Sequence, residues 1–286
     1  MINIFTTLDD AYYPRLKVFC KSLKKHNKSP IVLTITYYNL SEKNLRDFER
    51  FSQKIGLEYR LYKMERERTE RLKLIHHIVS EAYNKLFVLD VYPDEERALW
   101  IDVDTVVLGD ISEFYNCDMG DYYVSGVAET KGALDKIRLG LEESGCYINA
   151  GVILFNLTQI RKDFITEDFF ALYQNNEDKI RFADQDIVNL AFAKNTKNEK
   201  TGLYNYLIRS ETKLSLKEVA KLRKEAKIIH FIRHIKPWHY YYQGNARFIY
   251  LKEMFPIYPL TSIYLFLAGE LYKFKRNKKT LSNSNK

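Results

Sequence analysis

Two aspartates, Asp102 and Asp104, stand at the end of the apolar stretch ALWIDV at residues 98–103. In an extended chain, side chains at positions i and i+2 point to the same side. We therefore predict that both carboxylates can bind one cation. Carboxylate oxygens suit Mg²⁺ or Mn²⁺, which bridge to phosphates and neutralise their charge. The alternative is that two aspartates at the end of a strand merely begin a turn.

The elements that must position these residues alternate between strands and helices. We expect strands at residues 2–7, 31–37, 58–62, 98–103, 121–127, 150–156 and 227–232, and helices at 12–26, 41–55, 65–90, 158–175 and 184–194. This alternation predicts an α/β protein with a mainly parallel sheet covered on both faces. Ligands of such sheets lie beyond the carboxyl ends of the strands. A site is therefore expected after 2–7, after 98–103 and at 228–236.

Size and composition allow one large α/β domain with an appendage, or two small domains, in 286 residues that are 46% hydrophobic. The net charge of +8 indicates an anionic partner, such as nucleic acid, lipid headgroups or phosphorylated small molecules. Three widely spaced cysteines match neither a disulfide framework nor a zinc site, which favours a reducing compartment. We expect neither a signal peptide nor a membrane-spanning helix.

The stretch LWIDVDTVVLGDISEFY resembles the metal-binding segment of family 8 glycosyltransferases, the retaining family that includes glycogenin and bacterial lipopolysaccharide galactosyl- and glucosyltransferases. Further similar segments follow in the order of the family: TTLDDAY near the start, INAGVILFNL, ADQDIVN and HFIRHIKPW. Together they span residues 6–238. The resemblance implies a single GT-A type domain at residues 1–255, with a Rossmann-like, mainly parallel sheet flanked by helices. A C-terminal aromatic and basic tail follows at residues 256–286.

The resemblance implies a metal site made by Asp102, Asp104 and His230. An imidazole ligand favours Mn²⁺ over Mg²⁺ because the softer nitrogen suits the transition metal. Lys236 would bind the diphosphate and stabilise charge on the UDP leaving group. The alternative for His230 is a purely structural role.

Residues that would bind the donor, UDP-glucose or UDP-galactose, are implied near the start of the chain. Thr7 and Asp9 would meet the edge of the uracil. Tyr12 would stack on its face, which typically contributes ~1–3 kcal/mol. Alternatively, Tyr12 is a core ring, and Asp9 and Asp10 cap the first helix. Lys85 would point at the diphosphate or a sugar hydroxyl, or else be a solvated helix lysine.

Further donor contacts are implied in the middle of the chain, where Val103 between the two aspartates belongs to the donor site. Asn149, followed by Ala150, would hydrogen-bond a sugar hydroxyl, although this segment could simply start a strand. Asp184 would bind hydroxyls of the donor sugar, with Gln185 near the reacting carbon. With Lys236, these last two form the implied catalytic set. The neighbouring Asp186 is equally suited to the first turn of a helix.

One position departs from the family pattern H-x-x-G-x-x-K-P-W, because its glycine is replaced by Arg233. A glycine lets the backbone approach the phosphate closely, whereas arginine is disfavoured where φ is positive. The guanidinium could instead bind the diphosphate, since arginine–phosphate pairs are strong. The substitution brings the loop geometry, and with it activity, into question.

We therefore predict a metal-dependent retaining transferase that moves a hexose from a UDP-sugar to a saccharide or glycolipid acceptor in lipopolysaccharide or capsule synthesis. Front-face substitution is favoured, because no residue is a sure nucleophile. An inactive UDP-sugar-binding protein and a self-glucosylating enzyme like glycogenin are the alternatives. A nucleic-acid partner is not expected, because the acidic segments would repel a phosphate backbone.

The tail combines an apolar segment with a basic one. Residues 257–272 carry one formal charge, and residues 273–286 carry six basic residues and no acid. This arrangement predicts contact with an anionic membrane surface, where each basic residue contributes about 1 kcal/mol. The alternative is a helix that docks on the core, followed by a disordered end. We expect a cytoplasmic protein, peripheral on the inner face of the cell membrane.

Overall fold

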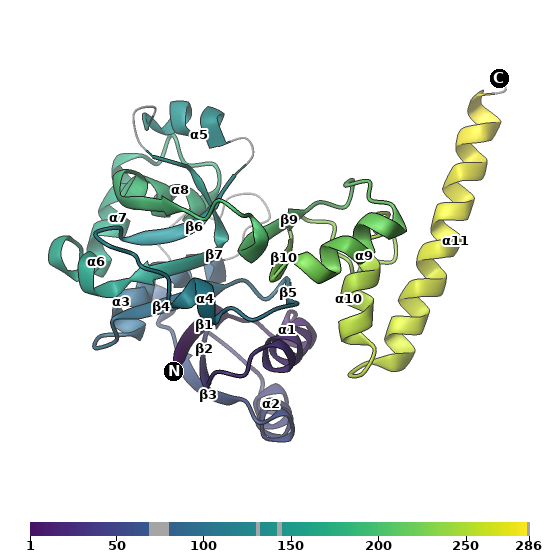
Figure 1. Cartoon of the computed structure of the whole chain (residues 1–286), viewed down its shortest axis with the longest axis horizontal. Coiled ribbons are helices and arrows are strands. Elements are labelled where there is room, and N and C mark those ends of the chain that lie inside the picture. Colours follow the sequence, from purple (N-terminus) through teal and green to yellow (C-terminus); the bar gives the residue numbers. More distant parts are fainter. Residues whose placement is uncertain (69–79, 130–131, 142–144, 285–286) are drawn as a thin grey trace.

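The centre of the molecule is a seven-stranded sheet in the order β3-β2-β1-β4-β7-β6-β8 (Figure 1). The structure is a computed structural model that describes residues 1–68, 80–129, 132–141 and 145–284. The strands are β1 (Ile2–Thr7), β2 (Ile31–Tyr37), β3 (Glu58–Lys63), β4 (Arg97–Ile101), β6 (Val124–Ala128), β7 (Ile148–Asn156) and β8 (Thr196–Asn198). Strands β3, β2, β1 and β4 run parallel, whereas β7 is antiparallel to both its neighbours. The prediction of a mainly parallel α/β sheet is confirmed.

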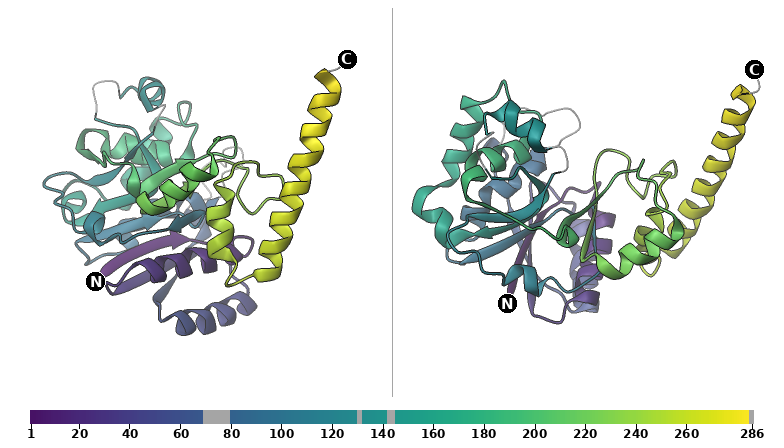
Figure 2. Two further views of the ribbon diagram at one scale, coloured as in Figure 1. Left: turned by 45° about the vertical axis from the view of Figure 1, so that its right-hand side comes forward. Right: turned by 45° about the horizontal axis from the view of Figure 1, so that its top comes forward.

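Helices cover both faces of this sheet (Figures 1 and 2). They are α1 (Tyr13–His26), α2 (Glu42–Ile55), α3 (Val88–Val91), α4 (Ser112–Tyr115), α5 (Gly132–Leu139), α6 (Leu157–Asp163), α7 (Thr166–Asn175), α8 (Ala183–Phe192), α9 (Leu216–Glu225), α10 (Arg247–Met254) and α11 (Pro259–Ser284). The described part of the chain also contains the 3₁₀ segments η1 (Arg66–Arg68), η2 (Ser80–Phe87), η3 (Ala193–Asn195) and η4 (Leu203–Asn205). Successive strand residues point to opposite faces, so Ile4 packs in the core beneath α1 and α2, and Phe5 in the core beneath α7 and α8.

Local sequence explains several boundaries. The β-branched stretch IVLTITY forms β2, which is buried at every position but the last, as expected for the interior of a covered parallel sheet. Helix α2 begins where the hydroxyl of Ser41 accepts a hydrogen bond from the backbone N–H of Asn44. It ends at Gly56, whose φ of 63° is accessible to glycine at little cost.

A second, three-stranded sheet stands beside the main one. Strand β10 (Ile228–Phe231) lies between β5 (Thr105–Val107) and β9 (Tyr206–Ile208), antiparallel to the first and parallel to the second. Because β5 follows β4 after a short turn, the chain passes from the main sheet into the small one between residues 101 and 105. His230 is paired with Thr105 across the small sheet, so a residue late in the chain lies beside this turn.

Three predicted elements differ from the structure. The strand expected at 98–103 ends at Ile101, and Asp102 to Asp104 form a turn in which the Thr105 hydroxyl donates to the Asp102 carbonyl at 2.8 Å. The helix expected at 158–175 is two helices, because the chain is extended at Ile165 and the Asp168 carboxylate accepts from the Ile165 N–H at 2.8 Å.

The single helix expected at residues 65–90 is also wrong for the residues described there. They form η1, η2 and α3, and residues 69–79 lie outside the described part. Residues 83–88 are all buried, whereas a helix docked by one face would leave a polar side in water. The segment is instead enclosed between the main sheet and α8.

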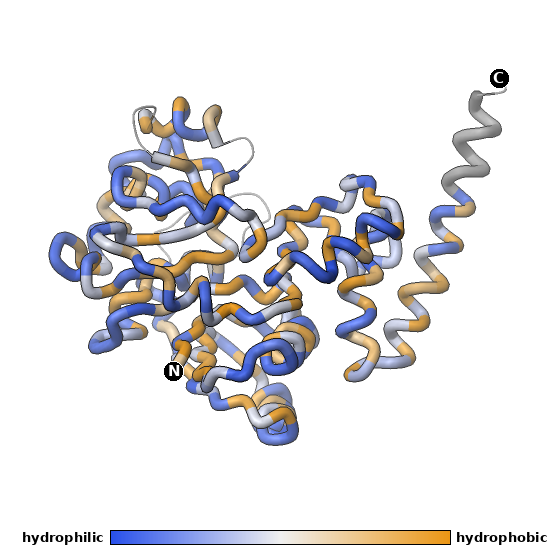
Figure 3. Tube along the Cα trace, viewed as in Figure 1, coloured by the Kyte–Doolittle hydropathy of each residue, from blue (hydrophilic) through white to orange (hydrophobic). Residues whose placement is uncertain are grey.

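The C-terminal helix α11 extends away from the rest of the molecule in every view (Figures 1 and 2). One face docks on α10, with Leu265 buried and the Phe248 and Phe266 ring centroids 5.9 Å apart. Apolar side chains on other parts of the helix remain exposed, namely Leu260, Ile263, Tyr264, Leu267, Leu271 and Phe274. Apolar and polar residues alternate along its described part (Figure 3). Within the described residues, no helix combines the length and apolar character needed to cross a bilayer.

Candidate active site

The residues singled out from the sequence gather in two adjoining cavities, of about 140 and 300 Å³. Thr7, Asp9 and Val103 line the first cavity. The second is lined by Lys85, Asn149, Ala150, Asp184, Gln185, His230, Arg233 and Lys236, and Tyr12, Asp102 and Asp104 border both. These residues come from the end of β1, η2, the β4–β5 turn, β7, the start of α8, and β10 with the loop after it. The site therefore lies beyond the carboxyl ends of β1 and β4, as the fold predicts.

Asp102, Asp104 and His230 form a cluster in which one ligand atom from each lies within 4.8 Å of the others. The Nε2 atom of His230 is 3.1 Å from Asp104 Oδ1 and 3.7 Å from Asp102 Oδ2. The turn at 102–104, and not an extended chain, brings the two carboxylates to one side. The predicted pairing of these aspartates thus occurs for a different reason from the one that we inferred.

Gly151 makes room for this cluster. Its carbonyl accepts from the Asp102 N–H at 2.8 Å, so β7 lies against the turn. A Cβ at position 151 would lie 2.0 Å from Cε1 of His230 and 3.0 Å from Oδ2 of Asp102. Any side chain at this position would displace the imidazole. The glycine of the N-A-G segment at residues 149–151 therefore has a steric role toward His230. From the sequence we predict only that this glycine permits close backbone approach.

The cluster has the ligand atoms that a divalent cation requires. Asp104 Oδ1 is buried and accepts no hydrogen bond within the described part of the chain, although His230 Nε2 is near. Two carboxylates and one imidazole form a mixed oxygen and nitrogen set, which fits Mn²⁺. A cation there would satisfy the buried oxygen, so these residues fit the metal that the pattern predicts.

Lys236 is the second charged neighbour of Asp104. Its Nζ is 2.6 Å from Asp104 Oδ2 and also donates to the Phe231 carbonyl at 2.6 Å. Burial alone would raise the pKa of Asp104, but Lys236 and His230 outweigh it and hold that pKa below its ordinary value. Asp104 is therefore ionised and ready to bind a cation.

Lys85 is buried and not a solvated helix lysine. Its Nζ forms an ion pair with Asp184, donates to the Ala150 carbonyl at 2.9 Å and lies 3.7 Å from Asp102 Oδ1. Burial would lower the pKa of Lys85, but Asp102 and Asp184 outweigh it and raise that pKa. Burial has the opposite effect on a carboxyl group and raises the pKa of Asp184, and the adjacent ammonium group of Lys85 offsets part of this increase. One buried cation thus links the turn at Asp102 to the start of α8.

Gln185 joins β7 to α8 through both ends of its amide. Its Oε1 accepts from Asn149 Nδ2 at 3.1 Å and from the Ala150 N–H at 3.0 Å, and its Nε2 donates to the Tyr147 hydroxyl at 3.2 Å. Asp186 is fully buried, binds both guanidinium nitrogens of Arg138, and accepts from two backbone N–H groups before α8. Asp186 therefore holds the start of the helix, and its oxygens are occupied.

The smaller cavity contains the residues assigned to the uracil. Tyr12 is partly buried, lies edge-on to Trp238 with centroids 5.9 Å apart, and borders both cavities. Asp9 Oδ1 accepts from the Tyr12 N–H at 2.7 Å, so it also orders the start of α1. The Thr7 hydroxyl accepts from Asn84 Nδ2 at 2.8 Å. Asp9 thus orders the turn before α1 but does not cap the helix, because the N-cap residue is Tyr12 and has no side-chain cap hydrogen bond. Asp10 does not cap it either and accepts from Ser41 and Asn44. One oxygen of the Asp9 carboxylate has no hydrogen-bond partner that we describe.

Among the described residues, two that are not glycine have positive φ; one lines this site and the other lies between two residues that line it. Arg233 has φ of 70° and Ala183 has φ of 43°. Such conformations cost roughly 1–2 kcal/mol each and cluster at functional sites. Arg233 adopts the positive φ that its substitution for glycine brought into question. Its Nε is 4.0 Å from Glu211 Oε1, and both side chains are more than half exposed, so this contact holds it weakly.

Two residues of the site were not identified from the sequence. Trp100 Nε1 donates to Asp102 Oδ1 at 2.6 Å and thereby orients that carboxylate. Asn205 Oδ1 lies 3.1 Å from His230 Nδ1. Trp100 stands two positions before Asp102 in the apolar stretch, so its place in the chain was a usable signal. Asn205 lies in a segment with no motif and could be found only from the three-dimensional contacts.

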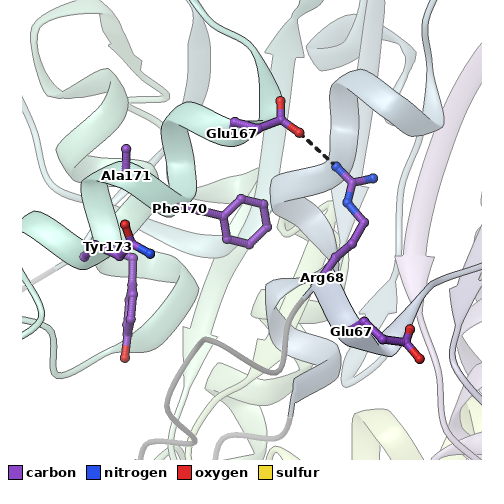
Figure 4. Close-up of a pocket in the computed structure, with 7 residues that line it drawn as sticks. Glu67, Arg68, Glu167, Phe170, Ala171 and Tyr173 are labelled. Carbon is purple, nitrogen blue, oxygen red and sulfur yellow. Dashed lines mark hydrogen bonds and ion pairs between the residues drawn. The ribbon is translucent and has the colours of Figure 1, made fainter.

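A larger cavity, of about 480 Å³, lies elsewhere, between η1 and α7 (Figure 4). Its wall includes Phe170, Tyr173 and the ion pair of Arg68 with Glu167 at 3.4 Å. None of the residues predicted to act on a donor lines it. Size alone therefore does not locate the site, whereas the converging carboxylates, imidazole and ammonium groups do.

Comparison with known proteins gives a consistent match. The model of the protein family described as Glycosyl transferase family 8 matches residues 3–241. General stress protein A of Bacillus subtilis is 25% identical over 268 residues, covering 89% of this chain and 92% of the relative. A lipopolysaccharide 1,2-glucosyltransferase of Escherichia coli is 24% identical over 292 residues, covering 98% and 85%.

A solved structure shows the same fold. The galactosyltransferase LgtC, crystallised in complex with donor and acceptor sugar analogues, superposes with a TM-score of 0.75. The match covers 88% of this chain and 95% of that one, at 21% identity. The likeness extends over nearly the whole of both chains, and at this identity it establishes the fold.

Proposed function

Because the chain belongs to glycosyltransferase family 8, we propose that it moves glucose or galactose from a UDP-sugar to a saccharide acceptor, with a bound metal and retention of configuration. The observation that carries this proposal is the convergence of Asp102, Asp104 and His230 with Lys236 in one cavity. A divalent cation and a buried ammonium group side by side suit a diphosphate, because both neutralise its charge.

The cavities allow a donor to be placed by the chemistry of their walls. The uracil would occupy the smaller cavity, with Tyr12 on its face and Thr7 and Asp9 at its edge. Val103 also lines this cavity. Asp102, Asp104 and His230 would hold Mn²⁺, or Mg²⁺ in its place, which neutralises phosphate charge when bound. Mn²⁺ is favoured because the set contains a nitrogen.

The hexose and its leaving group would occupy the larger cavity. Asp184 and Asn149, beside Ala150, would bind hydroxyl groups of the sugar. Lys236 would transfer its interaction from Asp104 to the diphosphate as UDP leaves, which stabilises the developing charge. Arg233, held only weakly by Glu211, would turn its guanidinium toward the same diphosphate.

The acceptor is proposed to attack the sugar on the same face from which the leaving group departs. A double displacement needs a free carboxylate beneath the sugar. Asp186 is fully buried with its oxygens occupied, and both ends of Gln185 are hydrogen-bonded. In front-face substitution the departing phosphate accepts the proton of the acceptor hydroxyl. A trapped glycosyl adduct on Gln185 or Asp186 would refute this mechanism.

The test is release of UDP by the purified protein from a panel of UDP-sugars, with and without Mn²⁺. We expect Mn²⁺-dependent release from UDP-glucose or UDP-galactose. Asp104→Asn should lower the rate at least about 100-fold, because it removes a metal ligand. Asp110→Asn is the matched control, since this exposed aspartate caps the N–H of Ser112 outside the cavities. A donor that neither binds nor is consumed would refute the proposal.

We further propose that residues 1–255 form the catalytic domain and that the tail, residues 256–286, holds it against an anionic membrane surface. The exposed apolar residues of α11 lead into a run with six basic residues after position 272. This combination suits a helix lying in the lipid headgroups. The protein would then act in the cytoplasm, peripheral to the inner face of the membrane, on a glycolipid acceptor such as lipopolysaccharide core. The named E. coli relative supports an acceptor of this class.

Co-sedimentation with vesicles tests the membrane proposal. We expect binding to vesicles containing phosphatidylglycerol and weak binding to pure phosphatidylcholine, falling as salt is raised. The double variant Leu267→Glu, Leu271→Glu should abolish binding. Leu134→Glu on α5 is the control, because it changes a leucine outside the tail that is at least as exposed as Leu267 and Leu271. Equal binding by both variants would refute the assignment.

A further inference from the structure

Asn205 is a buried residue that links two parts of the site. It lies at the end of η4, and only 1% of its surface is exposed. Its Nδ2 donates to Asn149 Oδ1 at 2.9 Å, and its Oδ1 lies 3.1 Å from His230 Nδ1. Asn149 Oδ1 also accepts from the backbone N–H of Gly151 at 3.0 Å. These contacts form one chain from the backbone of β7 to the imidazole on β10.

The backbone end of this chain determines the direction of every bond in it. A backbone N–H can only donate, so the atom of Asn149 that faces Gly151 must be its oxygen. The group of Asn205 that faces the same oxygen must then be its NH₂. The oxygen of Asn205 therefore faces His230, and Nδ1 of the imidazole must carry the proton that it receives.

The tautomer of His230 decides whether it can bind a cation. With the proton on Nδ1, the lone pair of Nε2 points toward Asp104 Oδ1 and Asp102 Oδ2. With the proton on Nε2, the ring would instead donate to Asp104 Oδ1, 3.1 Å away, and offer no lone pair. The nearby carboxylates favour this second, closed form. Some other group must therefore favour the first.

We propose that Asn205 is a positioning residue that holds His230 in the Nδ1-protonated form, so that Nε2 is available to a metal ion. The inference rests on the proposed metal-dependent function. Removing a partner that fixes the tautomer of a ligating histidine typically weakens metal binding by about 10–100-fold. Asn205 thereby couples the N-A-G segment of β7 to the ligand on β10.

The first measurement is the tautomer of His230 in the metal-free wild-type protein. Long-range ¹H–¹⁵N correlation spectra at alkaline pH distinguish the two forms, and His230→Gln identifies the signal among the six histidines. We expect protonation at Nδ1. A ring protonated at Nε2 would overturn the proposal, and this test does not depend on any variant at position 205.

The second measurement is Mn²⁺ affinity, by calorimetry or by the electron paramagnetic resonance signal of free Mn²⁺. Asn205→Leu keeps the number and branching of the side-chain heavy atoms but removes both hydrogen bonds, and it should weaken binding about 10–100-fold while moving the proton to Nε2. Asn27→Leu is the matched control, because Asn27 is a buried asparagine with two backbone bonds, to Leu23 and Ile111. It should lower stability without changing Mn²⁺ affinity.

The outcomes separate this inference from the function on which it rests. Unchanged Mn²⁺ affinity in a folded Asn205→Leu protein overturns the role of Asn205 and leaves the metal site in place. A wild-type protein that binds no Mn²⁺ refutes the metal-dependent function, and this inference with it.

Discussion

Replacing Gly151 by alanine adds one carbon atom, Cβ, at the point where β7, the Asp102 turn and His230 meet. The new Cβ would lie 2.0 Å from Cε1 and 2.4 Å from Nδ1 of His230. Ordinary contact begins at 3.4 Å, so the ring must move by about 1.4 Å, the difference between 3.4 and 2.0 Å. The ring cannot turn freely, because Asn205 holds Nδ1 at 3.1 Å.

A displacement of this size exceeds what a metal site tolerates. Ligand distances vary by only about 0.2 Å around their preferred values. A shift of roughly 1 Å in a catalytic group can lower the rate about 100-fold. We therefore expect Gly151→Ala to weaken Mn²⁺ binding about 10–100-fold and to lower kcat/KM for the UDP-sugar about 100-fold. Overpacking should cost about 1–3 kcal/mol of stability.

Calorimetric titration with Mn²⁺ and initial rates of UDP release measure the two effects. Gly126→Ala is the control, because its Cβ would meet the flexible end of Ile148 at 2.9 Å and the Val152 carbonyl oxygen at 3.3 Å, but no atom of the metal cluster. This control should keep metal affinity and rate within about twofold of wild type. If Gly151→Ala binds Mn²⁺ as tightly as wild type, the steric argument for this glycine is wrong.

Three further predictions concern charged residues. Arg233→Gly removes a strained φ but adds the entropy of glycine, so stability should change by less than about 1 kcal/mol in urea unfolding, while KM for the donor rises. Lys85→Met leaves Asp184 buried without its ion-pair partner and should lower the free energy of unfolding by about 3–5 kcal/mol. A hydrogen bond from Lys17 is the largest cause that lowers the pKa of Asp47, so this carboxylate stabilises the fold above about pH 4 and loses its effect as the pH falls through the lowered value. Asp47→Asn should remove that part of the acid dependence of the melting temperature, and an unchanged acid profile would refute it.

Much of the fold could be predicted because local patterns carry it. The β-branched stretch at 31–37 determines β2, and the capping serine at position 41 determines the start of α2. Each signal lies within or next to the element that it specifies. Such signals fail where burial surrounds a segment on all sides, as at residues 83–88. They also fail where a single side chain divides a helix, as Asp168 does. Hydrophobic periodicity identifies a segment with one buried face, but it identifies neither a fully buried segment nor a break inside a helix.

The residue types of the site were determined by the sequence alone: two aspartates after a buried strand, a histidine and lysine late in the chain, and an acidic pair at the start of a helix. Together with the resemblance to family 8 glycosyltransferases, they predict a cation and a diphosphate before any contact is known. Only the tertiary structure decided how they meet. The turn at Asp102, the pairing of β10 with β5, the space at Gly151 and the bond from Asn205 to His230 are set by neighbours far apart in the chain. Local sequence determines which groups are present, whereas sheet pairing and packing determine the distances on which their chemistry depends.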